Sequence, residues 1–105
     1  MPNRMEKINA LLTEEVGAEL GRLGSGTSLA TVTSVETTSD LREAAVWVSL
    51  LPDDDAAWEA LLERQKHLQA YLARRLTIKR TPKISLKRDR SGQHAQRISE
   101  LLRQT

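Results

Sequence analysis

The chain has 105 residues, no cysteine and a net charge of +2, and its aromatic residues are two Trp and one Tyr. These values favour a single domain over residues 1–105 in a reducing compartment, and they exclude disulfides, thiolate metal sites and cysteine nucleophiles. The charges are sorted along the chain: residues 1–62 hold four Lys/Arg against eleven Asp/Glu, a net of −7, whereas residues 63–105 hold twelve against three, a net of +9.

The basic second part is typical of a protein that binds a polyanion, most often nucleic acid. A solvated basic surface kept for solubility is the alternative. No apolar run approaches the length of a membrane span, and the N-terminus lacks the apolar stretch of a signal peptide. We therefore expect a cytoplasmic protein with no membrane partner.

The first half of the chain predicts a helix followed by a hairpin. Apolar residues recur at helical spacing over about residues 4–22, with Asn3 as a capping residue. Residues 28–37 are rich in β-branched side chains and predict a strand. Val32 and Val35 have opposite parity there, so either one is exposed or a β-bulge lies between them. Residues 42–50 alternate as a second strand, and the short connection predicts an antiparallel pair.

The second half predicts a helix, a strand and a helix. The helix begins after three aspartates at 53–55, which suit capping better than Mg²⁺ binding, and it runs to about residue 77. That length leaves a bend or break open. A strand follows Pro82, and a last helix covers about residues 92–103. The order α-β-β-α-β-α predicts an α+β fold in which helices pack on one face of a three-stranded sheet.

The main candidate for nucleic-acid binding is a run of cations from the end of the long helix into the third strand. Arg and Lys there would contact phosphates without reading bases, and we expect about half of them to touch RNA. The members are Arg74, Arg75, Lys79, Arg80, Lys83, Lys87, Arg88 and Arg90. Trp47, on the second strand, could stack on a base, but packing across the sheet is the favoured interpretation.

Other chemistry is not indicated. The sequence lacks a Gly-x-x-Gly loop, and the glycines at 21, 24 and 26 are typical of a connector. His67 and His94 are too few for a convincing metal site, and Ser91 and Ser99 have no His/Asp arrangement around them. We expect no cofactor, no metal and no enzymatic activity.

Several segments resemble the bacterial ribosome-binding factor A family. That family commonly has a Val-Glu, a Ser-x-Asp-Leu turn and an Ala-x-Val-x-Val-Ser strand, and residues 35–49 resemble this pattern with Val35-Glu36, the turn Ser39-Asp40-Leu41 and the strand at 44–49. Residues 4–9, 68–86 and 89–102 are similar to its first helix, its Arg-Leu/Ile-Lys and Pro-x-Leu region, and its final turn and helix. The matches cover nearly the whole chain in the right order.

The resemblance implies a type II KH-like fold of order α-β-β-α-(kink)-α-β. It also implies binding to the 30S ribosomal subunit during late maturation of 16S rRNA, by a monomer that is not an enzyme. The chain departs from the family in three places. It lacks an Asp-Pro-Arg-Leu-type segment before the first strand, it lacks a long C-terminal tail, and Arg64-Gln65-Lys66 stands where a small-x-Gly kink is usual. The last departure favours a straighter helix.

Two other functions stay open. One is a KH-like RNA-binding module with a target outside the ribosome. The other is a protein-interaction domain in which the acidic half of one copy pairs with the basic half of a neighbour.

Overall fold

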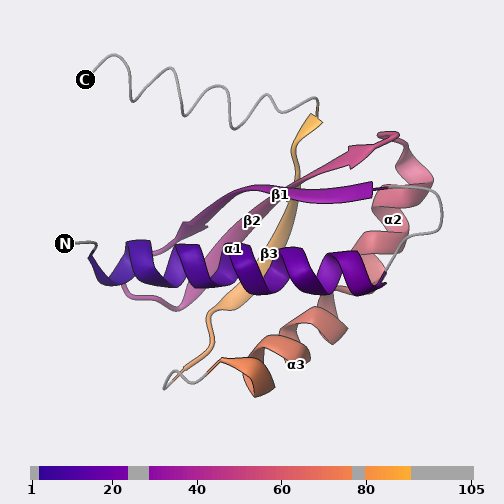
Figure 1. Ribbon diagram of the computed structural model, residues 1–105. Helices are drawn as coiled ribbons and strands as arrows, with labels where there is room; N and C mark the ends of the chain where they lie inside the picture. The colour runs from indigo at the N-terminus through magenta and orange to yellow at the C-terminus, as the bar shows by residue number, and fades with distance from the viewer. Residues whose placement is uncertain (1–2, 24–28, 77–79, 91–105) are drawn as a thin grey trace, which may run out of the picture.

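The computed structural model describes residues 3–23, 29–76 and 80–90, and Figure 1 shows their arrangement. The elements follow the order α1 (Arg4–Leu23), β1 (Leu29–Thr37), β2 (Glu43–Leu51), α2 (Asp55–Glu63), α3 (Gln65–Arg75) and β3 (Lys83–Arg88). The helix expected over about residues 92–103 lies outside the described residues. None of the helices in the described ranges combines the length and the apolar character that a membrane span needs.

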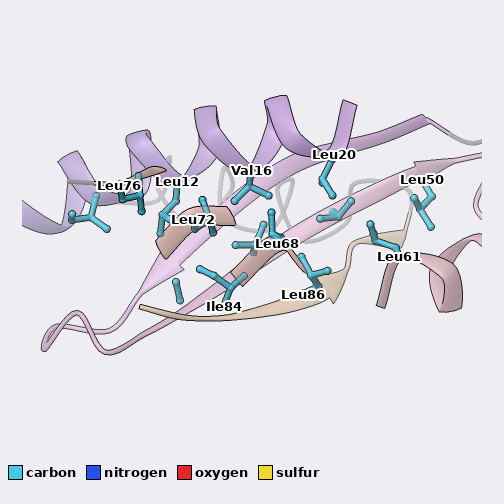
Figure 2. Close-up of a cluster of buried hydrophobic side chains, with 14 of the residues drawn as sticks. Leu12, Val16, Leu20, Leu50, Leu61, Leu68, Leu72, Leu76, Ile84 and Leu86 are labelled. Atoms are coloured by element: carbon cyan, nitrogen blue, oxygen red, sulfur yellow. The ribbon is translucent and has the colours of Figure 1, made fainter. Parts of the chain in front are cut away.

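Helix α1 begins at a capping box. The Oδ1 atom of Asn3 accepts a hydrogen bond from the main-chain N–H of Glu6 (2.8 Å), and the Glu6 carboxylate accepts one from the Asn3 N–H (3.3 Å). The apolar stripe that follows repeats every four residues and is buried: Ile8, Leu12, Val16 and Leu20. Because this spacing puts the side chains on one helix face, α1 lies along the sheet with that face inward (Figure 2).

The three strands form one sheet in the order β1-β2-β3. β1 and β2 are antiparallel, as the short turn predicted, and β2 and β3 are parallel. In β1, Val32 lies opposite Val48 and Ser34 lies opposite Trp47, so Thr33 is an extra residue. The parity conflict is thus resolved by a bulge, and both Val32 and Val35 pack against the core.

The helices cover one face of this sheet, as expected. The alternate residues of β2 and β3 that face them are buried: Ala44, Val46, Val48, Leu50, Ile84 and Leu86. From the helix side, Leu68, Leu72 and Leu76 at α3 and its C-terminal end meet the α1 stripe over the same strands (Figure 2). The open face carries Lys83, Ser85 and Lys87 of β3 opposite Glu43, Ala45 and Trp47 of β2.

The sequence left open whether the second helix runs straight or breaks, and the structure has a break at Arg64, between α2 and α3. Arg64 has φ −90° and ψ −1°, and its N–H donates to the carbonyls of Leu61 and Leu62. The N–H of Leu68 then donates to the Arg64 carbonyl (2.9 Å), which begins the new helix. This backbone conformation is open to any residue type, so the break needs neither glycine nor a small side chain.

The break directs α3 along the outer edge of β3, where two glutamines take the place of a neighbouring strand. Gln65 Oε1 accepts from the N–H of Leu86 (3.0 Å), and Gln69 Oε1 accepts from the N–H of Ile84 (2.7 Å). Gln69 Nε2 also donates to the Pro82 carbonyl (2.9 Å). The spacing of the two glutamines along the helix matches the spacing of the two amides along the strand. Four residues of a helix rise by about 6 Å, and two residues of a strand rise by about 6.6 Å.

Candidate nucleic-acid interface

The structure divides the predicted basic run between several surfaces. Lys83 and Lys87 are exposed on the open face of the sheet, as their spacing predicted. They share that face with acidic side chains, because Glu43 is the register partner of Lys83 and a shallow depression beside Lys87 is also lined by Glu36. The open face is therefore of mixed charge.

Arg88 is turned to the helix side of β3 and is already neutralised. Its guanidinium bonds to Asp53 (Nη2–Oδ1, 2.8 Å) and to Asp55 (Nη1–Oδ1, 2.8 Å) at the start of α2, and its side chain is only 13% exposed. Hydrogen bonding to Arg88 lowers the pKa of the Asp55 carboxyl below its usual value. The predicted capping function falls to Asp54, whose carboxylate accepts from the Ala57 N–H (2.7 Å).

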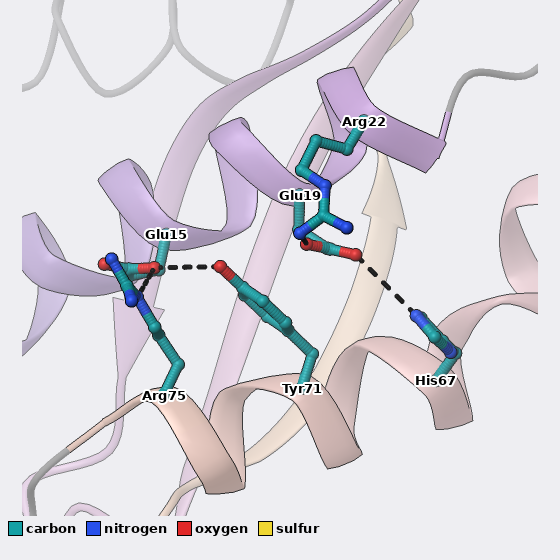
Figure 3. Close-up of polar contacts among 6 residues, drawn as sticks. All are labelled: Glu15, Glu19, Arg22, His67, Tyr71 and Arg75. Atoms are coloured by element: carbon teal, nitrogen blue, oxygen red, sulfur yellow. Dashed lines mark hydrogen bonds and ion pairs between the residues drawn. The ribbon is translucent and has the colours of Figure 1, made fainter.

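Arg75 is also engaged, in a polar network between α1 and α3 (Figure 3). Its Nε lies 3.2 Å from Glu15 Oε2, which also accepts a 3.3 Å hydrogen bond from the Tyr71 hydroxyl. One turn further along α1, the buried carboxylate of Glu19 lies 3.3 Å from Arg22 and 3.7 Å from His67. This network holds α3 against α1, and it gives His67 a structural contact.

Arg74, Arg90 and Lys79 complete the predicted set. Arg74 is exposed at the end of α3, where it borders the depression between α3 and α1. Arg90 is exposed just beyond β3, at the opposite end of that strand from Arg80. Lys79 lies outside the described residues. The seven of these cations that the structure describes therefore do not form one continuous patch.

One group of three arginines contains two residues that the sequence did not single out. Arg4 at the start of α1 and Arg42 before β2 line a groove of about 660 Å³ together with Arg80 from the segment before β3. The parallel pairing of β2 and β3 brings the last two together, and the Lys83 N–H donates to the Arg42 carbonyl (2.8 Å). A strand-helix-strand connection favours parallel pairing, so this approach of Arg42 to Arg80 could have been foreseen.

The turn between β1 and β2 fixes the position of Arg42. Asp40 Oδ1 accepts hydrogen bonds from the Thr38 hydroxyl (2.6 Å) and from the Arg42 N–H (3.0 Å). These two bonds lower the pKa of the Asp40 carboxyl below its usual value. The resulting Asx-type turn holds the chain so that Leu41 has a positive φ of 61°.

No group of His, Asp and Glu suited to holding a metal ion occurs among the described residues. Trp47 is half-buried, between Ser34 of β1 and Lys87 of β3 in the strand register. The arrangement as a whole can attract phosphates through exposed guanidinium and ammonium groups.

Comparison with known proteins decides the family. The sequence model of ribosome-binding factor A matches residues 4–102. The chain belongs to the ribosome-binding factor A family. Ribosome-binding factor A from Akkermansia muciniphila is 32% identical over 105 residues, covering 97% of this chain and 84% of that protein. Its counterpart from Chlorobium luteolum is 36% identical over 109 residues, covering 98% and 92%.

Solved structures of ribosome-binding factor A have the same fold. The crystal structure of the Thermus thermophilus protein superposes with a TM-score of 0.70 at 25% identity, over 82% of this chain and 97% of that one. A homology model of the T. thermophilus protein, fitted into the cryo-EM map of a 30S complex, gives 0.66 at 27% identity, over 75% and 88%. The α+β fold class that the sequence predicted is confirmed.

Proposed function

We propose that this protein is a ribosome assembly factor that binds the 30S ribosomal subunit and assists late maturation of its 16S rRNA. The observation that carries the proposal is the likeness to a ribosome-binding factor A that has been fitted into the map of a 30S complex. The protein acts as a monomer in the cytoplasm, and it acts by binding rather than by catalysis.

The exposed cations supply the physical means. Arg80 and Lys83 lie beside Arg42 at one end of the sheet, and Arg4 faces the same groove. Such groups attract the rRNA backbone and orient the protein on it, but they do not distinguish one base from another. Specificity for the 30S subunit then comes from the shape of the folded rRNA and its proteins.

Co-sedimentation with ribosomal subunits tests the binding. The purified protein should migrate with free 30S particles and not with 70S ribosomes, and binding should weaken as salt rises. Equal affinity for an unrelated structured RNA would instead favour a general RNA-binding module. Oligomers that salt disperses, without RNA binding, would favour a protein-interaction domain.

A charge reversal tests the surface. The variant Arg80→Glu/Lys83→Glu/Lys87→Glu should no longer migrate with 30S particles. The matched control Lys7→Glu/Arg64→Glu/Lys66→Glu reverses three exposed cations on α1 and around the α2–α3 break, and it should still bind. If the first variant binds as well as the control, this surface is not the one that contacts the subunit.

Maturation is tested in cells. Depletion of the protein should raise the proportion of unprocessed 16S rRNA precursor in the 30S fraction, and re-expression should restore it. An unchanged proportion would limit the proposal to subunit binding.

A further inference from the structure

Three arginines from distant parts of the sequence converge on one groove. Arg4 comes from the first turn of α1, Arg42 from the hairpin turn and Arg80 from the segment before β3. All three are exposed, and the groove volume of about 660 Å³ is within the range of small-ligand sites. The fold therefore gathers, at one end of the molecule, charges that the sequence keeps about 38 residues apart.

This charge is only partly balanced. Among the described residues, Asp40 is the one acid that lines the groove, and its Oδ1 atom already accepts from Thr38 and from the main chain of Arg42. The Arg42 Nε atom is 3.9 Å from Asp40 Oδ2, at the limit of an ion pair. Within the part of the chain that the structure describes, Arg4 and Arg80 make no ion pair. Their guanidinium groups are therefore available to an anion from solution.

The groove also has an apolar floor. Met5 and Leu41 are half-buried beside the arginines, and Ile8 and Pro82 lie beneath them. The positive φ of Leu41 is a conformation that a leucine rarely adopts. The Asx-type turn around Asp40 holds it there, so that an apolar side chain lines a site whose rim is cationic.

We propose that this groove binds one unpaired nucleotide of an RNA strand, with its phosphate on Arg4, Arg42 and Arg80 and its base against Met5 and Leu41. The inference rests on the proposed function and names the part of the rRNA that this site takes. Guanidinium groups match phosphate geometry, and the flat apolar side of a base matches the floor. A base inside a duplex is stacked and paired, so only an unpaired one can reach the floor.

The same features predict weak sequence preference. In the described part of the groove lining, the polar side chains other than the arginines are Ser39 and Asp40. Asp40 is engaged in the turn, which leaves few groups to read the edge of a base. An acidic peptide would use the arginines but would gain little from the apolar floor, which is why RNA is favoured.

The test measures binding of a fluorescent oligouridylate to the whole chain across a salt series. The variant Arg4→Gln/Arg42→Gln/Arg80→Gln removes the three charges of the groove, and Lys7→Gln/Arg64→Gln/Lys66→Gln removes three exposed charges elsewhere. The groove variant should reduce the slope of log affinity against log salt by about 0.7, because the groove holds one phosphate of a single strand. The control should keep nearly the whole slope.

A second variant tests the floor without changing charge. Met5→Ala should weaken oligouridylate binding about threefold, from the loss of roughly 30 Å² of apolar contact. The same substitution should leave binding of a blunt RNA duplex unchanged. Circular dichroism of each variant shows whether it is folded.

Three results would overturn the proposal: equal losses in the groove variant and the control, equal effects of Met5→Ala on strand and duplex, or displacement of oligouridylate by polyglutamate at equal charge. These outcomes are separate from the proposed function. If oligouridylate binds in the groove but 30S particles are not bound, the groove proposal stands and the ribosomal function fails. If the wild-type protein binds 30S particles and the groove variant binds oligouridylate as well as the wild type does, the ribosomal function stands and the groove proposal fails.

Discussion

The hydroxyl of Thr33 donates a 2.6 Å hydrogen bond to Oδ2 of Asp89 across the width of the sheet. Thr33 is the bulge residue of β1, and its Oγ1 also lies 3.3 Å from the carbonyl of Trp47 in the central strand. Asp89 follows β3, is 2% exposed, and donates its N–H to the Val48 carbonyl (2.8 Å). The bulge in one outer strand therefore fixes the end of the other, which carries the exposed Lys83 and Lys87.

Removing this hydroxyl should destabilise the fold. Thr33→Val keeps the shape of the side chain but leaves the buried Asp89 carboxylate without one donor, at a cost of about 1–3 kcal/mol in the free energy of unfolding. Thr33→Ser keeps the hydroxyl and should lose much less. Urea denaturation of the three proteins measures both values, and a larger loss in Thr33→Ser than in Thr33→Val would show that the methyl group contributes more than the hydrogen bond.

The two glutamines of α3 should respond differently to the same change. Among the described residues Gln65 bonds through its oxygen alone, so Gln65→Glu keeps the acceptor for the Leu86 N–H. Gln69 uses both its oxygen and its nitrogen, so Gln69→Glu would place a carboxylate oxygen against the Pro82 carbonyl. We expect Gln69→Glu to reduce the free energy of unfolding by about 1–3 kcal/mol and Gln65→Glu by clearly less. Thermal and urea unfolding measure the difference, and a larger loss for Gln65→Glu would contradict the geometry.

Acid should weaken the contact between α2 and β3. The hydrogen bond from Arg88 lowers the pKa of Asp55 below its usual 3.8. The pKa of Asp55 is lower in the folded state than in the unfolded state. The stabilisation by its contact with Arg88 is therefore fully present above the unfolded-state pKa, and it is lost as the pH falls through the folded-state pKa. Stability should therefore drop more steeply below about pH 4 in the wild type than in Asp55→Asn. Urea midpoints at pH 3 to 6 measure this, with Glu59→Gln on the same helix as the control.

An arginine that is held in an ion pair should contribute less to RNA binding than one that is not. Arg75 is held by Glu15, whereas Arg80 has no ion pair in the described part of the chain. Arg80→Gln should lower the salt slope of 30S binding, by at most about 0.7–0.9 because it shares its phosphate with Arg4 and Arg42, and Arg75→Gln should leave the slope nearly unchanged. Binding measured across a salt series distinguishes them. A larger effect from Arg75→Gln would mean that Glu15 releases it on the ribosome.

Local rules were sufficient for much of the fold. The Asn3 cap, the spacing of the α1 stripe and the parity conflict at Val32 and Val35 each depend on neighbours in sequence, and the structure confirms the cap, the stripe and the bulge. The sequence could not settle whether the helix breaks near Arg64, because the contacts that hold α3 are distant along the chain. Gln65 and Gln69 bond to β3, about 15 to 21 residues further on, and that attraction is absent from any local pattern.

The candidate site shows the same limit. The distribution of charge along the sequence predicted a binding surface within residues 63–105, but Arg4 and Arg42 belong to the acidic half of the sequence. The sheet topology carries them to Arg80, while Arg88 and Arg75 are paired with acids of the first half. The division into an acidic and a basic half therefore does not survive folding, because parallel pairing and helix packing mix the two.

The glutamines along β3 also determine how the molecule meets other copies of itself. A bare outer strand offers its unpaired amides as a template on which further chains can add, which is how fibrils grow. Gln65 and Gln69 already accept hydrogen bonds from the amides of Leu86 and Ile84, so a further strand could add to this edge of the sheet only after α3 had detached from it. The helix thus protects the strand from fibrillar assembly and leaves its two lysines in solvent.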